Sequence, residues 1–142
     1  MLRSAPFLLV LLCATGCDKS PGAPTPPGPG IVNVPVHFQD AFSRDRVTLS
    51  FEGEEVYQAT MSTLATGLAD AYALRADEDG GDQLVEVRVD TVGAEESVIG
   101  AVRFDPAEDA AVVVRFRRYD SASSTPASLS LTPVAELPTY GG

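Results

Sequence analysis

The sequence predicts an all-β domain, a sandwich of two sheets with about seven strands. From Ile31 onward, apolar residues alternate with polar ones over short runs. This alternation is typical of strands with one buried face and one face in water. Clusters of Gly, Pro, Asp and Ser, which favour turns, separate the runs. Many short strands joined by short turns predict two packed sheets.

The expected strands follow one another along the chain, with Val, Leu or Phe at the inward positions that strands favour. We expect Phe51, Val87 and Phe116 to be buried. The architecture resembles that of immunoglobulin-like and fibronectin-like domains, although tryptophan is absent and no cysteine follows Cys17. The inward positions are Val32, Val34, Val36 and Phe38; Val47, Leu49 and Phe51; Val85, Val87 and Val89; Val98, Val102 and Phe104; Val112, Val114 and Phe116; Leu129 and Leu131.

Pro35 and residues 62–76 depart from this regular pattern. Pro35 has no N–H for a ladder bond, so the first strand is expected to be an edge strand or to pair on one side only. Residues 62–76 allow a strand with a loop or one short helix. Leu68 and Tyr72 lie at helical spacing, whereas Gly67 in the middle of the segment favours the strand and loop.

The first sixteen residues are typical of an export signal. Arg3 supplies a positive charge, and residues 5–16 form an apolar run that is too short for a span of about 20 residues. The junction Ala14-Thr15-Gly16-Cys17 resembles the lipobox of bacterial lipoproteins, although Leu is commoner than Ala at the first position. The resemblance implies that residues 1–16 are removed and that Cys17 becomes the lipid-modified first residue, carrying acyl chains such as palmitate.

The chain after the signal divides into a tether, a domain and a tail. Residues 17–30 hold the lipidated cysteine and a Pro/Gly-rich stretch, residues 31–134 the sandwich, and residues 135–142 the tail. Proline favours extended geometry, so the thirteen residues from Asp18 to Gly30 could reach about 40 Å from the bilayer.

Asp18 stands directly after the cysteine, where aspartate keeps enteric lipoproteins in the inner membrane. The resemblance therefore implies an inner-membrane protein that faces the periplasm. The alternatives are a location in the outer membrane or at the cell surface, and a host cell with only one membrane. Arginine outnumbers lysine nine to one, which is typical of GC-rich genomes outside the enteric group.

Charge and cysteine content exclude some classes. Twenty acidic residues against ten basic ones give a net charge of -10, which repels nucleic-acid phosphates and anionic lipid headgroups. Nucleic acid is therefore not an expected partner. Cys13 leaves with the signal and Cys17 is capped by lipid, so we expect a domain without disulfides whose stability comes from its core.

Two features could suggest catalysis or metal binding. His37, the only histidine, lies on the polar face of the first expected strand, and we interpret it as an exposed strand residue. No Gly-x-Ser-x-Gly elbow or metal-ligand spacing accompanies it. The acidic run from Asp77 to Asp82 is interpreted as a solvated turn, with calcium binding as the open alternative. The sequence predicts no catalytic residue, metal site or cofactor.

Arg115, Arg117 and Arg118 form the densest basic cluster of the sequence. The first two share one face of a strand and the third lies on the other. Guanidinium groups grip carboxylates in a fork, so an anion or acidic-glycan site is one interpretation. Cross-strand pairing with outward acids such as Glu86 and Asp90 is the other, which the acidic composition favours.

We expect a non-enzymatic binding or structural module, displayed at the cell envelope and contacting an envelope protein or glycan. The alternative is a small carbohydrate-active enzyme that uses paired carboxylates. An acidic cleft that holds a carboxyl group of raised pKa would favour the enzyme, because a general acid needs its proton near neutral pH.

Overall fold

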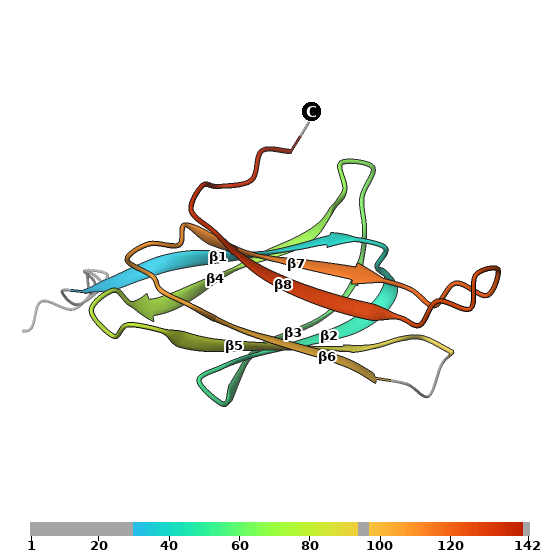
Figure 1. Cartoon of the computed structure of the whole chain (residues 1–142), viewed down its shortest axis with the longest axis horizontal. Helices are drawn as coiled ribbons and strands as arrows, with labels where there is room; N and C mark the ends of the chain where they lie inside the picture. The colour runs from blue at the N-terminus through green and yellow to red at the C-terminus, as the bar shows by residue number, and fades with distance from the viewer. Residues whose placement is uncertain (1–29, 94–96, 141–142) are drawn as a thin grey trace, which may run out of the picture.

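The computed structural model describes residues 30–93 and 97–140. The predicted signal, Cys17, Asp18 and nearly all of the tether lie outside these residues. The described residues form eight β-strands and no helix, arranged as two four-stranded sheets packed face to face (Figure 1). The all-β sandwich expected from the sequence is confirmed, and its architecture is that of immunoglobulin-like domains. No helix in this part of the chain is long and apolar enough to span a membrane.

One sheet has the strand order β4-β1-β7-β8 and the other β3-β2-β5-β6. Neighbouring strands are antiparallel, except for β1 and β7, which are parallel. The strands are β1 (Ile31–Asp40), β2 (Ser43–Phe51), β3 (Glu54–Ser62), β4 (Leu68–Asp77), β5 (Gln83–Asp90), β6 (Ser97–Phe104), β7 (Ala111–Arg117) and β8 (Ser128–Val134).

The ambiguous segment 62–76 consists of the end of β3, a turn and most of β4, so the strand with a loop is confirmed and the helix is wrong. The turn depends on Gly67, whose φ of 86° lies in the left-handed region that favours glycine. A hydrogen bond of 3.0 Å from the Gly67 N–H to the Leu64 carbonyl closes the turn. Leu74 and Ala76 then point into the core from β4.

Pro35 does not place β1 at an edge, because β1 lies between β4 and β7 in the centre of its sheet. The prediction that the first strand lies at an edge or pairs on one side only is wrong, because β1 pairs with both β4 and β7. Pro35 lies opposite Ala73 of β4, and the parallel pairing with β7 begins one residue later, at Val36. The missing N–H therefore costs no ladder bond to β7.

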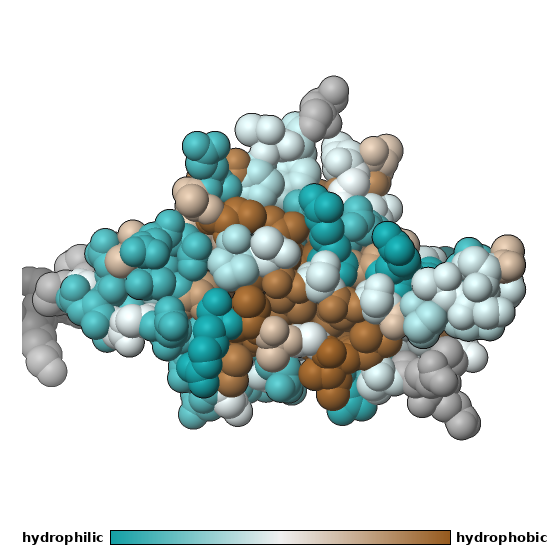
Figure 2. Space-filling model, viewed as in Figure 1, coloured by the Kyte–Doolittle hydropathy of each residue, from teal (hydrophilic) through white to brown (hydrophobic). Residues whose placement is uncertain are grey.

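The core lies between the two sheets and contains the inward residues of every strand. Val87 and Phe116 are buried as expected, whereas Phe51 is half-buried and packs at 6.2 Å between ring centroids against Phe104. The edges β6 and β8 also meet: a Cβ on Gly100 would lie 2.7 Å from Leu131. Figure 2 shows hydrophobic side chains along this side of the sandwich.

Candidate functional site

The outer face of the β4-β1-β7-β8 sheet carries the candidate site. Alternate residues of a strand point to the same face, so Arg115 and Arg117 of β7 both point outward. The antiparallel register places Ser130 of β8 opposite Arg115, and Ser128 opposite Arg117. On the other side of β7, Gln39 of β1 lies beside Arg115. The pairing order β1-β7-β8 thus brings basic, hydroxyl and amide side chains to one surface.

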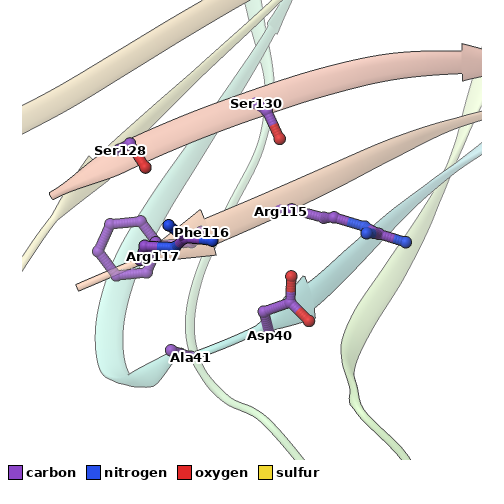
Figure 3. A pocket seen from close by; sticks show the side chains of 7 residues that line it. All are labelled: Asp40, Ala41, Arg115, Phe116, Arg117, Ser128 and Ser130. Atoms are coloured by element: carbon purple, nitrogen blue, oxygen red, sulfur yellow. The ribbon is translucent and has the colours of Figure 1, made fainter.

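Two adjoining hollows form a groove on this surface, which we call the arginine groove. The first, about 620 Å³ in volume, is lined by Asp40, Ala41, Arg115, Phe116, Arg117, Ser128 and Ser130. Figure 3 shows the two arginines on β7, between the serines of β8 and Asp40 of β1. The second, about 450 Å³, shares Asp40 and Arg115 with the first and is completed by Gln39, Thr66, Gly67, Pro138, Thr139 and Tyr140.

Neither Arg115 nor Arg117 forms an ion pair or a side-chain hydrogen bond with any residue that the structure describes. The expected pairing with Glu86 and Asp90 is wrong, because both acids lie on β5, in the other sheet. There Asp90 pairs with Arg88 of its own strand at 2.9 Å. Both guanidinium groups in the groove are exposed and available to a ligand.

Asp40 supplies a carboxylate to the groove from the end of β1. Its φ of 77° lies in the left-handed region, which aspartate tolerates better than most residues. A register shift between Phe38 and Gln39 precedes it, and such bulges redirect the side chains beside them. Asp40 forms no ion pair with the arginines. The groove therefore offers hydrogen-bond donors and an acceptor side by side.

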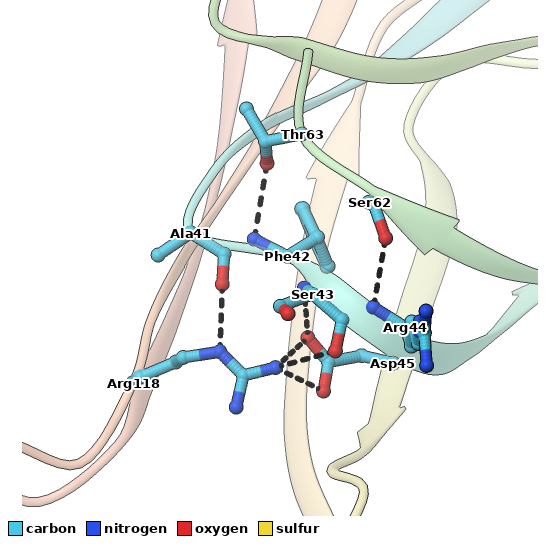
Figure 4. A network of polar contacts seen from close by, with 8 residues as sticks. All are labelled: Ala41, Phe42, Ser43, Arg44, Asp45, Ser62, Thr63 and Arg118. Atoms are coloured by element: carbon cyan, nitrogen blue, oxygen red, sulfur yellow. Dashed lines mark hydrogen bonds and ion pairs between the residues drawn. The ribbon is translucent and has the colours of Figure 1, made fainter.

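Arg118, the third arginine of the cluster, is half-buried and is held by contacts within the protein (Figure 4). Its Nη2 donates to both carboxylate oxygens of Asp45, at 2.6 and 2.5 Å, and to the Ser43 carbonyl at 3.0 Å. Its Nε donates to the Ala41 carbonyl at 2.9 Å. Asp45 is fully buried and also accepts the Ser43 N–H at 2.7 Å. Arg118 thus fixes the turn between β1 and β2, which includes the groove residue Ala41.

His37 is not the exposed strand residue expected from the sequence, because Tyr140 of the C-terminal tail packs over it. The ring centroids are 5.3 Å apart, and the Tyr140 hydroxyl hydrogen-bonds to His37 Nδ1. Gln39 Nε2 donates to the same hydroxyl oxygen at 2.7 Å. Burial lowers the pKa of His37, so the neutral imidazole is favoured and Nδ1 can accept the hydroxyl proton.

Side chains in and beside the acidic run between β4 and β5 form hydrogen bonds to the backbone of that run. Asp77 Oδ1 accepts the Asp79 N–H at 3.0 Å, and Gln83 Nε2 donates to the Asp77 carbonyl at 2.6 Å. No group of three or more acidic, histidine or cysteine side chains that could hold a metal occurs among residues 30–93 and 97–140. Nothing in this turn supports the calcium alternative.

Two carboxylates, those of Glu55 and Asp90, line a hollow of about 280 Å³ on the other sheet, together with Arg46 and Arg88. A hydrogen bond from the Ser97 hydroxyl, helped by Arg88, lowers the pKa of Asp90. A general acid of a glycosidase needs the opposite shift. Asp90 is therefore not suited to be the general acid of this pair.

Sequence reasoning found Arg115 and Arg117 but missed Asp40, the two serines and Tyr140. The alternation Ser128-x-Ser130 matches Arg115-x-Arg117 in period, which could have indicated two outward pairs. Only the strand order shows that the pairs are neighbours. Comparisons with protein-family models, with curated proteins and with solved structures found no match to this chain.

Proposed function

We propose that this protein is a lipid-anchored, non-enzymatic binding module of the bacterial cell envelope, and that its partner occupies the arginine groove. The observation that carries the proposal is that Arg115 and Arg117, both without a carboxylate partner in the described chain, line one hollow together. Of the eight arginines among residues 30–93 and 97–140, only Arg88 and Arg118 have carboxylate partners. Two unpaired guanidinium groups that line one hollow, with hydroxyl side chains beside them, suit an external anionic ligand.

The anchor in this proposal is the lipid on Cys17. One acyl chain holds a protein marginally and two or more hold it firmly, so the attachment needs no apolar patch on the sandwich. The Pro/Gly-rich stretch would then hold the groove up to about 40 Å from the bilayer. Asp18 favours the inner membrane facing the periplasm, with the outer membrane as the alternative.

A carbohydrate-active enzyme is the weaker candidate. Hydrolysis of glycosides takes two carboxyl groups that flank the bond. Asp40 is the only carboxylate among the described residues that line the arginine groove. The hollow that holds Glu55 and Asp90 offers two carboxylates, but the pKa of Asp90 shifts in the wrong direction for a general acid. A binding role without catalysis is compatible with both the arginine groove and the hollow that holds Glu55 and Asp90.

The test is co-sedimentation of a soluble form that begins at Asp18 with envelopes from host cells that lack the protein. We expect saturable binding that Arg115→Ala weakens at least tenfold. Arg75→Ala is the matched control, because Arg75 is an exposed arginine of β4 in the same sheet but outside the groove. Binding that both variants retain equally, or no saturable binding by the wild type, would contradict the proposal.

A further inference from the structure

The lining of the arginine groove indicates which chemistry it recognises. In the first hollow the accessible side chains other than Ala41 are charged or bear hydroxyls, whereas the one aromatic ring there, Phe116, is buried in the core. Protein partners are held mainly by aromatic or aliphatic anchors that enter pockets. A groove that offers guanidinium, hydroxyl and carboxylate groups instead matches a ligand rich in hydroxyl and acid groups.

The arrangement also repeats along the strands. Arg115 faces Ser130 and Arg117 faces Ser128, so two Arg–Ser pairs follow each other at a spacing of about 7 Å. Neither serine hydroxyl hydrogen-bonds to another described residue. A guanidinium group can hold a carboxylate through two parallel hydrogen bonds, and the hydroxyl beside it can bond a neighbouring oxygen. The repeat therefore matches a polymer in which acid and hydroxyl groups recur together.

We propose that the arginine groove binds a carboxylated polysaccharide, with acid groups of successive sugars on Arg115 and Arg117. Sugar hydroxyls bond to Ser128, Ser130 and the carboxylate of Asp40. This inference rests on the proposed function and adds the class of ligand. The second hollow extends the same chemistry, because Thr66, Thr139 and the Tyr140 ring lie beyond Arg115.

The charge of the whole chain makes this recognition selective. With a net charge of -10, the protein as a whole repels polyanions, whereas Arg115 and Arg117 give the groove a local positive charge. A polyanion that lacks the matching hydroxyl groups gains little from a local site of two arginines. Polyphosphate should therefore bind much more weakly than an acidic sugar chain of the same length.

The test is calorimetric titration of the lipidated chain, held in zwitterionic detergent, with hexamers of galacturonate and of mannuronate. We expect at least one hexamer to bind, and its methyl ester, which has no charge, to bind at least tenfold more weakly. Arg115→Ala and Arg117→Ala should each weaken binding at least tenfold. Ser128→Ala combined with Ser130→Ala should weaken it several-fold, and Arg75→Ala should leave it unchanged.

Three results would overturn the inference: equal binding of the methyl ester, polyphosphate binding as tight as that of the acidic hexamers, or an equal loss in Arg75→Ala. If neither hexamer binds while sedimentation with envelopes still depends on Arg115, the ligand class is wrong and the proposed function stands. If neither hexamer binds and sedimentation does not depend on Arg115, both fall. Unchanged thermal unfolding of each variant shows that a loss of binding is not a loss of fold.

Discussion

The arginines of this sandwich fall into two kinds, according to whether the guanidinium group has a partner within the protein. Arg118 donates hydrogen bonds to a fully buried carboxylate and to two backbone carbonyls, so its guanidinium group is already paired within the fold. Arg115, three residues earlier, points from the same region into open solvent without a partner among the described residues. The first arrangement stabilises the turn beneath the groove, and the second leaves a binding group free.

Removing Arg118 should destabilise the fold, because Asp45 would stay buried without its ionic partner. We expect Arg118→Met to lower the free energy of unfolding by about 3 kcal/mol, measured by urea denaturation. The control is the double variant Asp45→Leu with Arg118→Met, which removes the buried charge as well. The double variant should recover part of the lost free energy of unfolding. If its loss instead equals the sum of the losses in Asp45→Leu and in Arg118→Met, the two side chains do not stabilise each other and this explanation is wrong.

The phenol of Tyr57 should ionise at a higher pH than a free tyrosine side chain does. It donates to the Asp70 carboxylate and stacks on Tyr72, with 4.8 Å between ring centroids. Burial, then the hydrogen bond and charge of Asp70, raises its pKa to about 12. The fold favours the neutral phenol, so this contribution to stability is present below about pH 10 and is lost as pH rises towards 12. Absorbance titration of the phenolate should show a step near pH 12.

Tyr57→Phe supplies the control for this titration, because it keeps the ring and removes the hydroxyl. The step near pH 12 should disappear in this variant. Persistence of that step would assign it to another group and contradict the hydrogen bond to Asp70. In the sequence, Asp70 only interrupts an apolar face. Its partner lies on β3, thirteen residues earlier, and local periodicity contains no information about such a contact.

At the scale of elements, the sequence shows which residues form strands more clearly than how the strands pair. Period-two alternation is local, so most strands could be predicted from it, and the positive φ of Gly67 explains why a helix fails in 62–76. Strand order depends on contacts between distant residues. The pairing of β1 with β7 therefore could not be predicted, and neither could the meeting of Asp40 with Arg115.

The C-terminal tail should make stability depend on the protonation of His37. Burial lowers the pKa of His37 below its usual 6.5, so the fold favours the neutral imidazole beneath Tyr140. This contribution is complete above pH 6.5 and is lost as pH falls through the lowered pKa. We expect the melting temperature of the wild type to fall more between pH 7.5 and 5.5 than that of His37→Gln.

Tyr140→Phe tests the same contact from the tail. The substitution removes the hydroxyl that bonds to His37 and Gln39, and it should lower the free energy of unfolding by about 1 kcal/mol at pH 7.5.

For the pH test, an equal fall of the melting temperature in wild type and His37→Gln would show that His37 titrates as freely in the fold as in the unfolded chain. It would contradict the packing of the tail on the sheet.

At the scale of the whole molecule, a sandwich without a disulfide depends on its core. Phe116 is fully buried, and its ring centroid lies 5.3 Å from that of Phe42. We expect Phe116→Ala to lower the free energy of unfolding by about 3–5 kcal/mol, a large share of the total of about 5–15 kcal/mol. Tyr119→Ala, at an exposed aromatic two residues from the end of β7, should cost less than about 0.5 kcal/mol. Similar losses in both variants would contradict the core assignment.

The acidic sandwich gives no electrostatic attraction to an anionic bilayer, so attachment should depend on the lipid that we propose at Cys17. We expect labelled palmitate to enter the wild type. We also expect the protein to stay in the light, inner-membrane fraction of a sucrose gradient, because Asp18 follows the cysteine proposed to be lipidated. Asp18→Ser should move the protein to the dense, outer-membrane fraction while the label is kept.

Cys17→Ser is the control, because it removes the acceptor sulfur and leaves the sandwich unchanged. It should take up no palmitate and should leave both membrane fractions. Equal labelling of wild type and Cys17→Ser would rule out the lipid anchor. If the wild type is found in the dense fraction, only the retention by Asp18 is ruled out. The proposed binding function would remain, because a lipid-anchored domain on a tether of about 40 Å could present the arginine groove to a polysaccharide from either membrane.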